Sequence, residues 1–248
     1  MSGALEGKTA LVTGAGRGFG YAIARTFVAQ GATVIAHYRS SKAPLDELKK
    51  TASGRVVPVQ ADLRASQGAS ALLEAAVDAA PTIDVLVNNA GSMVVGPFAD
   101  SSEEAWSWDI DLNIRATLRI THGVLPAMTP GGDGRIINLS SQLALRPWDR
   151  GAVYAGTKGF LLSWTKSLAA ELGPQGITVN AIGPGSILTD MNTDVFPDES
   201  SRNKKALELP LRRMGSPQDV GDAALFLASA RSSFITGQYL GVNGGSQM

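Results

Sequence analysis

The segment TALVTGAGRGFG, residues 9–20, decides the fold of this 248-residue chain. A short apolar run leads into Gly14, Gly16, Gly18 and Gly20, and a helical stretch follows at residues 21–30. Such glycines allow a tight turn and leave the N–H groups at a helix N-terminus free to hold a pyrophosphate. Phe19 replaces the third glycine of the usual G-x-G-x-x-G fingerprint, so the pattern is T-G-x-x-x-G-x-G. We predict a dinucleotide site here, although the same residues also suit an ordinary strand-to-helix turn.

The rest of the chain alternates between strand and helix. Continuous apolar runs, typical of strands covered on both faces, lie at residues 9–13, 33–36, 56–60, 85–87, 135–139, 178–182 and 239–242. Helical stretches lie between them at residues 21–30, 69–79, 103–127, 153–172 and 217–228. This order predicts one α/β domain over residues 1–248, a Rossmann-type doubly wound parallel sheet of about seven strands with helices on both faces. The longest stretch without a clear period, residues 183–213, predicts a substrate lid at approximately 189–213.

Composition excludes several classes of protein. The 22 basic and 22 acidic residues balance, which gives no reason to expect nucleic acid or an anionic membrane as a partner. The absence of cysteine excludes disulfides, thiolate catalysis and cysteine-bound metals, and we expect no metal site. No apolar run approaches the roughly 18 residues of a membrane span, and residues 1–9 lack a hydrophobic signal core, so we expect a cytoplasmic protein. His37 and His122 fit no catalytic or metal pattern and are predicted to be structural.

The end of the second predicted strand indicates which cofactor binds. NAD-preferring enzymes usually place an acidic residue there, to hold the ribose 2′-hydroxyl. Here the strand ends in Arg39, and the next acidic residue is Asp46. Arg39, together with Arg17 in the glycine loop, can pair with a 2′-phosphate, unless both are simply solvated surface arginines. We predict NADP(H) in preference to NAD(H).

A tyrosine and a lysine carry the candidate chemistry. Tyr154 and Lys158 are four residues apart in a helical stretch, so their side chains share a face. An ammonium ~4 Å away favours a phenolate by about 4 kcal/mol at an effective dielectric constant of ~20, which lowers the tyrosine pKa by up to about three pH units. Ser140 and Ser141 directly follow the strand predicted at residues 135–139. A serine hydroxyl at this position can stabilise a substrate oxygen or merely hydrogen-bond to the backbone of the turn.

Taken together, the motifs resemble those of the short-chain dehydrogenase/reductase family over essentially the whole chain. The residues that carry the resemblance are Thr13-Gly14, Gly18-Phe19-Gly20, Asn88-Asn89-Ala90-Gly91, Ser141, Tyr154-x-x-x-Lys158 and Pro184-Gly185. The closing segments at residues 212–217 and 236–245 look like those of its 3-oxoacyl-acyl-carrier-protein-reductase-like branch.

The resemblance implies a role for each matching residue. Tyr154 would be the general acid/base, Lys158 would bind the nicotinamide ribose, and the usual spacing before the tyrosine selects Ser141 over Ser140. Asn113 matches the asparagine that bends its helix and supports a proton-relay water through Lys158. The remaining cofactor contacts implied are Asp62 and Leu63 at the adenine, Asn89, Ala90 and Gly91 at the ribose, and Pro184, Gly185, Ile187 and Thr189 at the carboxamide.

These expectations lead to an NADP(H)-dependent ketone or aldehyde reductase acting on a small carbonyl or alcohol substrate. The alternatives are a 3-oxoacyl-thioester reductase, a sugar or polyol dehydrogenase, and a non-catalytic cofactor-sensing scaffold. The resemblance also implies a homotetramer, in which Phe160 and Trp164 face a partner unless they belong to the core. The predicted wall of the substrate pocket comes from residues 92–95, residues 142–151 and the lid after Thr189. In that wall, Arg146, Asp149 and Arg150 face either an anionic group or water. Lys204 and Lys205 on the lid are better explained as a solvated face than as a carrier-protein contact.

Overall fold

A single seven-stranded parallel sheet forms the centre of the molecule, with the strand order β3-β2-β1-β4-β5-β6-β7. The computed structural model describes residues 3–52, 54–128 and 132–248. The strands are β1 (Thr9–Val12), β2 (Thr33–Tyr38), β3 (Val56–Gln60), β4 (Val85–Asn88), β5 (Arg135–Leu139), β6 (Thr178–Pro184) and β7 (Tyr239–Val242). The predicted doubly wound fold is confirmed, and the predicted strand positions agree with these bounds to within two residues.

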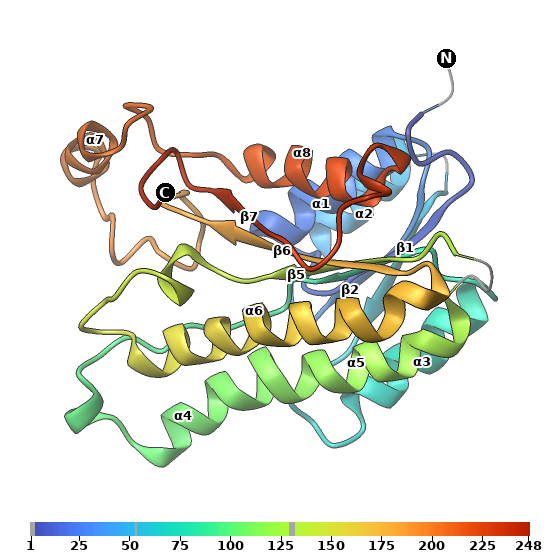
Figure 1. Ribbon diagram of the computed structural model, residues 1–248, viewed down its shortest axis with the longest axis horizontal. Helices are drawn as coiled ribbons and strands as arrows, with labels where there is room; N and C mark the ends of the chain where they lie inside the picture. Colours follow the sequence, from blue (N-terminus) through green and yellow to red (C-terminus); the bar gives the residue numbers. More distant parts are fainter. Residues whose placement is uncertain (1–2, 53, 129–131) are drawn as a thin grey trace.

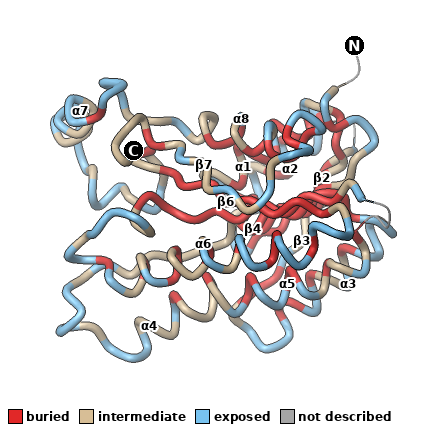
Figure 2. Tube along the Cα trace, viewed as in Figure 1, coloured by how far each residue is buried: buried red, intermediate tan, exposed pale blue. Residues whose placement is uncertain are grey.

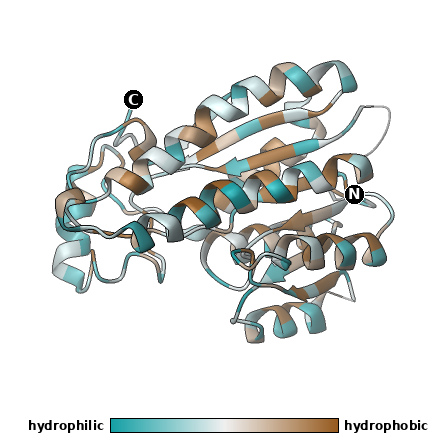
Figure 3. Ribbon diagram, turned by 90° about the horizontal axis from the view of Figure 1, so that it is seen from below, coloured by the Kyte–Doolittle hydropathy of each residue, from teal (hydrophilic) through white to brown (hydrophobic). Residues whose placement is uncertain are grey.

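Helices cover both faces of the sheet (Figure 1). One face carries α1 (Gly18–Ala29), α2 (Ala43–Thr51) and α8 (Pro217–Ala228). The other carries α3 (Gly68–Ala79), α5 (Thr117–Val124) and α6 (Ala152–Leu172). The central strands β1, β2, β4, β5 and β6 are almost entirely buried (Figure 2), whereas the edge strands β3 and β7 are mostly half-buried. Two apolar clusters fill the layers on either side of the sheet. Many helices alternate between hydrophobic and hydrophilic faces (Figure 3), as expected for helices packed on a sheet.

The helix predicted over residues 103–127 is interrupted. It begins as α4 (Glu103–Ile110), passes through a π-helical segment at Asp111–Ala116 and continues as α5. Asn113 lies within the π-helical segment, and its backbone carbonyl accepts a hydrogen bond from Thr117 Oγ1. π-Helical turns inside α-helices are often found at functional sites.

Two helices fall where we predicted none. The nine-residue helix α2 starts with a proline in its first turn, and it is too short to show a clear hydrophobic period. Helix α7 (Glu199–Glu208) lies in the predicted lid and has a polar sequence, so its periodicity is weak. Asp198 begins α7 by accepting a hydrogen bond from the Ser201 backbone N–H, and this capping box is the local signal for the helix.

Parallel topology brings the functional loops to one edge of the sheet. The chain moves outward from β1 to β3, then returns to place β4 on the other side of β1. The segments that follow β1, β4, β5 and β6 therefore meet at the carboxyl ends of neighbouring strands, where open α/β sheets bind ligands. Among the described residues, no helix combines the length and the apolar character needed to cross a membrane.

Candidate active site

Buried hydrogen bonds hold the glycine loop against the end of β4. Thr13 Oγ1 donates to Val87 O and accepts from the N–H groups of Asn89 and Ala90. Asn89 Nδ2 donates in return to the carbonyls of Thr13 and Gly14, at 2.8 and 3.1 Å. The loop thus has a defined shape, although no regular secondary structure supports it.

His37 fixes the other side of the loop. The Gly14 N–H donates to His37 Nδ1, and His37 Nε2 contacts Ala61 O at 3.1 Å. An acceptor at Nδ1 and a donor at Nε2 require the neutral ring. Burial lowers the pKa of His37, which also favours the neutral ring. The ring connects the ends of β1, β2 and β3 as a structural bridge, which agrees with the prediction that His37 is structural.

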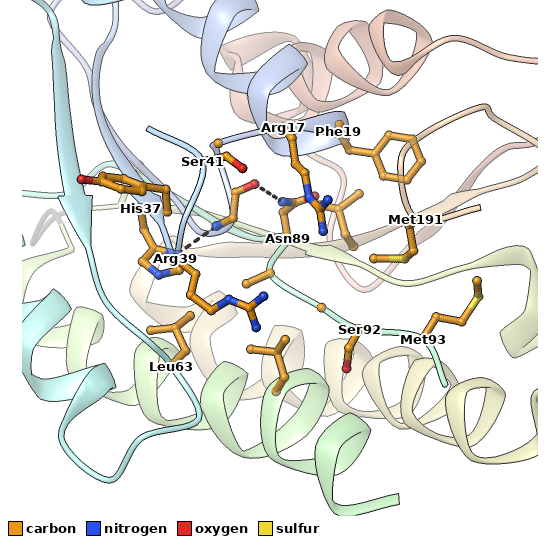
Figure 4. Close-up of a pocket in the computed structure, with 18 of the residues that line it drawn as sticks. Arg17, Phe19, His37, Arg39, Ser41, Leu63, Asn89, Ser92, Met93 and Met191 are labelled. Carbon is orange, nitrogen blue, oxygen red and sulfur yellow. Dashed lines mark hydrogen bonds between the residues drawn. The ribbon is translucent and has the colours of Figure 1, made fainter. Parts of the chain in front are cut away.

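The glycine loop forms one end of a cavity of about 420 Å³. Arg17 and Arg39 point into this cavity from the loop and from the end of β2 (Figure 4). The predicted cofactor residues that line it are Gly14, Gly16, Arg17, Gly18, Phe19, Arg39, Asp62, Leu63, Asn89, Ala90, Gly91, Tyr154, Lys158 and Thr189. Gly20 lies behind the loop instead, where a Cβ would overlap the Gly14 carbonyl, so its role is close packing.

Several residues of this cavity were missed by the sequence reasoning. The guanidinium of Arg64 stacks 3.3 Å from the ring centroid of Trp108, joining the end of β3 to α4. Ser41, after β2, and Met191, after β6, also line the cavity. Their positions depend on loops that approach one another only in the folded chain.

Tyr154, Lys158 and Asn113 form a connected buried cluster. Lys158 Nζ donates to Leu139 O at 2.8 Å and lies 5.6 Å from the centroid of the Tyr154 ring. Asn113 lies behind the cavity wall, where Nδ2 donates to Thr157 Oγ1, and Thr157 Oγ1 donates to Tyr154 O. The π-helical segment and α6 are therefore connected through hydrogen bonds, one turn from the tyrosine ring.

The predicted lowering of the tyrosine pKa is wrong for the protein alone. Burial raises the pKa of Tyr154 to about 12, which outweighs the lowering by its hydrogen bond with Ser141. Burial also lowers the pKa of Lys158 to about 8. The prediction assumed a charged ammonium beside the phenol in a medium of high effective dielectric. Burial instead disfavours the charged forms of both groups.

The two candidate serines have different partners. Ser140 Oγ donates to Lys158 O at 2.9 Å, a contact that ties β5 to α6. Ser141 Oγ accepts from Leu143 N at 3.1 Å and forms the hydrogen bond with Tyr154. Only the Ser141 hydroxyl therefore shares a hydrogen bond with the tyrosine, in agreement with the choice of Ser141.

A second cavity, of about 490 Å³, meets the first at the tyrosine. Both are lined by Phe19, Met93, Ser140, Tyr154, Thr189 and Met191, whereas Ser141, Pro184, Gly185 and Ile187 line the second. Asn192, which we did not predict, shapes the segment after β6. Its Nδ2 donates to Ile187 O and its Oδ1 accepts from Thr189 N.

Asp109 is a second residue that we did not predict. Its side chain is completely buried on α4 and accepts hydrogen bonds from Ser92 Oγ at 2.7 Å and Val94 N at 3.1 Å. These bonds hold the segment after β4, which forms part of the cavity wall. The negative charge of Asp109 also raises the pKa values of Tyr154 and Lys158, although burial dominates both.

Comparisons with known proteins show which family the chain belongs to. A family model described as enoyl-(acyl carrier protein) reductase matches residues 14–247. The chain is 40% identical over 259 aligned residues to oxidoreductase UcpA of Salmonella typhimurium, covering 99% of this chain and 97% of the relative. It is 37% identical over 248 residues to 3-oxoacyl-acyl-carrier-protein reductase FabG of Chlamydia trachomatis, covering 99% of each.

A solved structure shows the same arrangement of elements. It is the crystal structure of a blue fluorescent protein from a metagenomic library in complex with NADPH, with a TM-score of 0.91 and 35% identity. The match covers 99% of this chain and 100% of the other. The chain therefore belongs to the short-chain dehydrogenase/reductase family of oxidoreductases, with the 3-oxoacyl-acyl-carrier-protein reductases among its similar members.

Proposed function

We propose that the chain is an NADP(H)-dependent reductase of ketones or aldehydes that uses Tyr154 as its general acid/base. The observation that carries this proposal is the position of Tyr154 at the boundary of two cavities. One cavity holds the glycine loop, and the other is open beside Ser141. A cofactor in the first and a carbonyl compound in the second would meet at the tyrosine hydroxyl.

The residues of the first cavity fit a nicotinamide dinucleotide. Gly14 and Gly18 have φ values of +69° and +55°, and a Cβ on Gly14 would lie 2.9 Å from Asn89 Nδ2. Within the described chain, the first turn of α1 contains no acidic residue and its N-cap makes no side-chain capping bond, so its N–H groups are free for phosphates. When bound, the nicotinamide supplies or accepts the hydride.

Arg39 supports NADP(H) as the cofactor. The Arg39 side chain points into the cavity and forms no ion pair with any described residue. Asp62, which lines the same cavity, already accepts a hydrogen bond from the Arg64 backbone N–H at 3.0 Å and lies 3.7 Å from the Arg64 guanidinium. Arg17 Nη1 lies 3.7 Å from Asp190 Oδ2, which also lines this cavity. A 2′-phosphate would give Arg39 the anionic partner that it lacks.

The protein groups then perform the proton chemistry. Tyr154 donates a proton to the substrate oxygen during reduction and removes it during oxidation. Ser141 orients that oxygen and stabilises its developing negative charge. Lys158, held by Leu139 O, supplies positive charge beside the tyrosine, and Asn113 braces the helix from which both side chains project.

A Tyr154→Phe variant tests the proposal directly. We expect turnover to fall by about 10²–10⁴-fold, the usual contribution of a general acid/base, while NADPH binding stays within about threefold. The assay follows loss of NADPH or NADH absorbance with β-keto thioesters, cyclic and aryl ketones, aldehydes and keto-sugars. Near-normal turnover by Tyr154→Phe would overturn the assignment.

The same panel, extended to polyols with NAD or NADP, separates the alternatives. A requirement for a thioester indicates a 3-oxoacyl-thioester reductase, a reading favoured by the relatives of that name. NAD-linked oxidation of a polyol indicates a sugar or polyol dehydrogenase. Tight NADPH binding with no tyrosine-dependent turnover indicates a cofactor-sensing scaffold.

We also infer a homotetramer. Phe160 and Trp164 stack on α6 with ring centroids 6.0 Å apart, and both are only half-buried in the single chain. Trp164 packs partly against the core, so the exposed parts of the two rings are left to contact a partner subunit. Light scattering coupled to size-exclusion chromatography should give four times the chain mass of 25.8 kDa.

A further inference from the structure

The outer rim of the second cavity carries an unbalanced positive charge. Arg146, Lys204, Lys205 and Glu208 line the cavity, and Glu208 is the only acidic residue among its described lining residues. Arg146 lies in the segment after β5, whereas the other three belong to α7. The charges therefore converge on the cavity from two separate parts of the chain.

A single carboxylate does not neutralise these cations. Lys205 Nζ donates to Glu208 Oε2 at 2.7 Å, which forms one ion pair. Three cations against one carboxylate leave a net charge of +2, with Arg146 and Lys204 outside that pair. The pKa of Glu208 is lowered first by Lys205, with smaller contributions from Lys204 and Arg146, so all three cations act on the same carboxylate.

Much of the cavity lining between these cations and Tyr154 is apolar, although Gln142, Asn192 and Ser201 also belong to it. Leu143, Trp148, Met191, Val195 and Phe196 line the cavity, while Tyr154 lies buried at its inner end and Lys204 is exposed. Apolar walls with a few polar groups are typical of small-molecule sites, where the polar groups fix orientation. The cavity can thus distinguish the two ends of a ligand.

We propose that the substrate is an apolar carbonyl or alcohol compound with a carboxylate at the end remote from its reacting carbon, and that Arg146 and Lys204 bind this carboxylate. The inference rests on the proposed function only for the position of the reacting end at Tyr154. Arginine can bind a carboxylate through two parallel hydrogen bonds, and lysine adds a point charge. A cavity of about 490 Å³ also suits a whole small molecule.

Binding of octanoate and octanamide, measured by calorimetry, tests the subsite without any reaction. The variants are Arg146→Gln, Lys204→Gln and the double variant, and the control is Lys49→Gln, an exposed lysine on α2. We expect octanoate to bind about tenfold more tightly than octanamide, or ~1.4 kcal/mol, in the unaltered chain and in the control. The ratio should fall below about twofold in the double variant, while octanamide affinity stays constant and shows that the cavity is intact.

Equal affinity for the two ligands in the unaltered chain would overturn the proposal, as would a preference for octanoate that survives the double substitution. Neither ligand needs to react in this measurement. If the unaltered chain prefers octanoate and the double variant does not, while no carbonyl compound is turned over, only the reductase function is refuted.

A catalytic comparison then uses NADPH with 7-oxooctanoate, its methyl ester and acetoacetyl-coenzyme A. A tenfold higher kcat/KM for the acid than for the ester supports the proposal. A higher value for the thioester, lost in the double variant, would assign the cations to phosphate instead.

Discussion

Lys158→Met removes a lysine whose ammonium is buried and donates to Leu139 O. Burial lowers the pKa of Lys158 to about 8, from 10.5 for an unperturbed lysine. Between these values Lys158 binds more protons in the unfolded chain than in the folded chain, so the contribution of Lys158 to stability rises with pH. The destabilisation of the folded chain by the buried charge of Lys158 is complete below about pH 8 and disappears above about pH 10.5.

The two pKa values set the size of the effect. Linkage gives a penalty of about 3 kcal/mol at pH 7 and less than about 1 kcal/mol at pH 10 for the charged form of Lys158. The free energy of unfolding of the unaltered chain should therefore gain about 2–3 kcal/mol, relative to Lys158→Met, between these pH values. Loss of the hydrogen bond to Leu139 O shifts the variant by a constant amount and leaves this slope unchanged.

Urea unfolding at 25 °C, from pH 7 to pH 10, measures the difference. Lys49→Met serves as the control, because Lys49 is exposed and its removal should leave the pH dependence unaltered. A difference between the unaltered chain and Lys158→Met that stays constant within about 0.5 kcal/mol would refute the reasoning that burial dominates the charge of this lysine.

Three further predictions concern the site. Arg39→Ala should weaken NADPH binding by about 10–100-fold, the loss of a charge-assisted pair, and leave NADH binding within twofold; fluorescence titration measures both, with the exposed Arg231→Ala as control. Ser140→Ala should lower stability by about 1 kcal/mol with turnover retained, whereas Ser141→Ala should lower kcat/KM about 10–100-fold; the reverse pattern would exchange their roles. Asp109→Asn should lower the pKa of Lys158 further, because it removes a charge that raises it, and NMR titration of the lysine side chain measures the shift.

Local sequence patterns were enough to predict most of the fold. A buried parallel strand needs a continuous apolar run, and the glycine loop directly follows the first such run. Both features therefore depend only on residues that are adjacent in the sequence. Helix α7 was missed because its sequence is polar and its capping box is a short local signal. The helical period of residues 103–127 gave no sign of the π-helical segment, and only the family resemblance implied a bend at Asn113, because the partners of Asn113 lie after β4 and on α6.

The sequence by itself determined which chemical groups are present and in what order, including the tyrosine, the lysine and the two candidate serines. Tertiary structure decided their protonation and their partners, because burial and hydrogen bonding depend on distant parts of the chain. It separated Ser141 from Ser140 and raised the pKa of Tyr154 where the spacing alone predicted a decrease. It also brought Arg146 and Lys204 to one cavity, since charges 58 positions apart in the sequence meet only when the segments after β5 and β6 fold together.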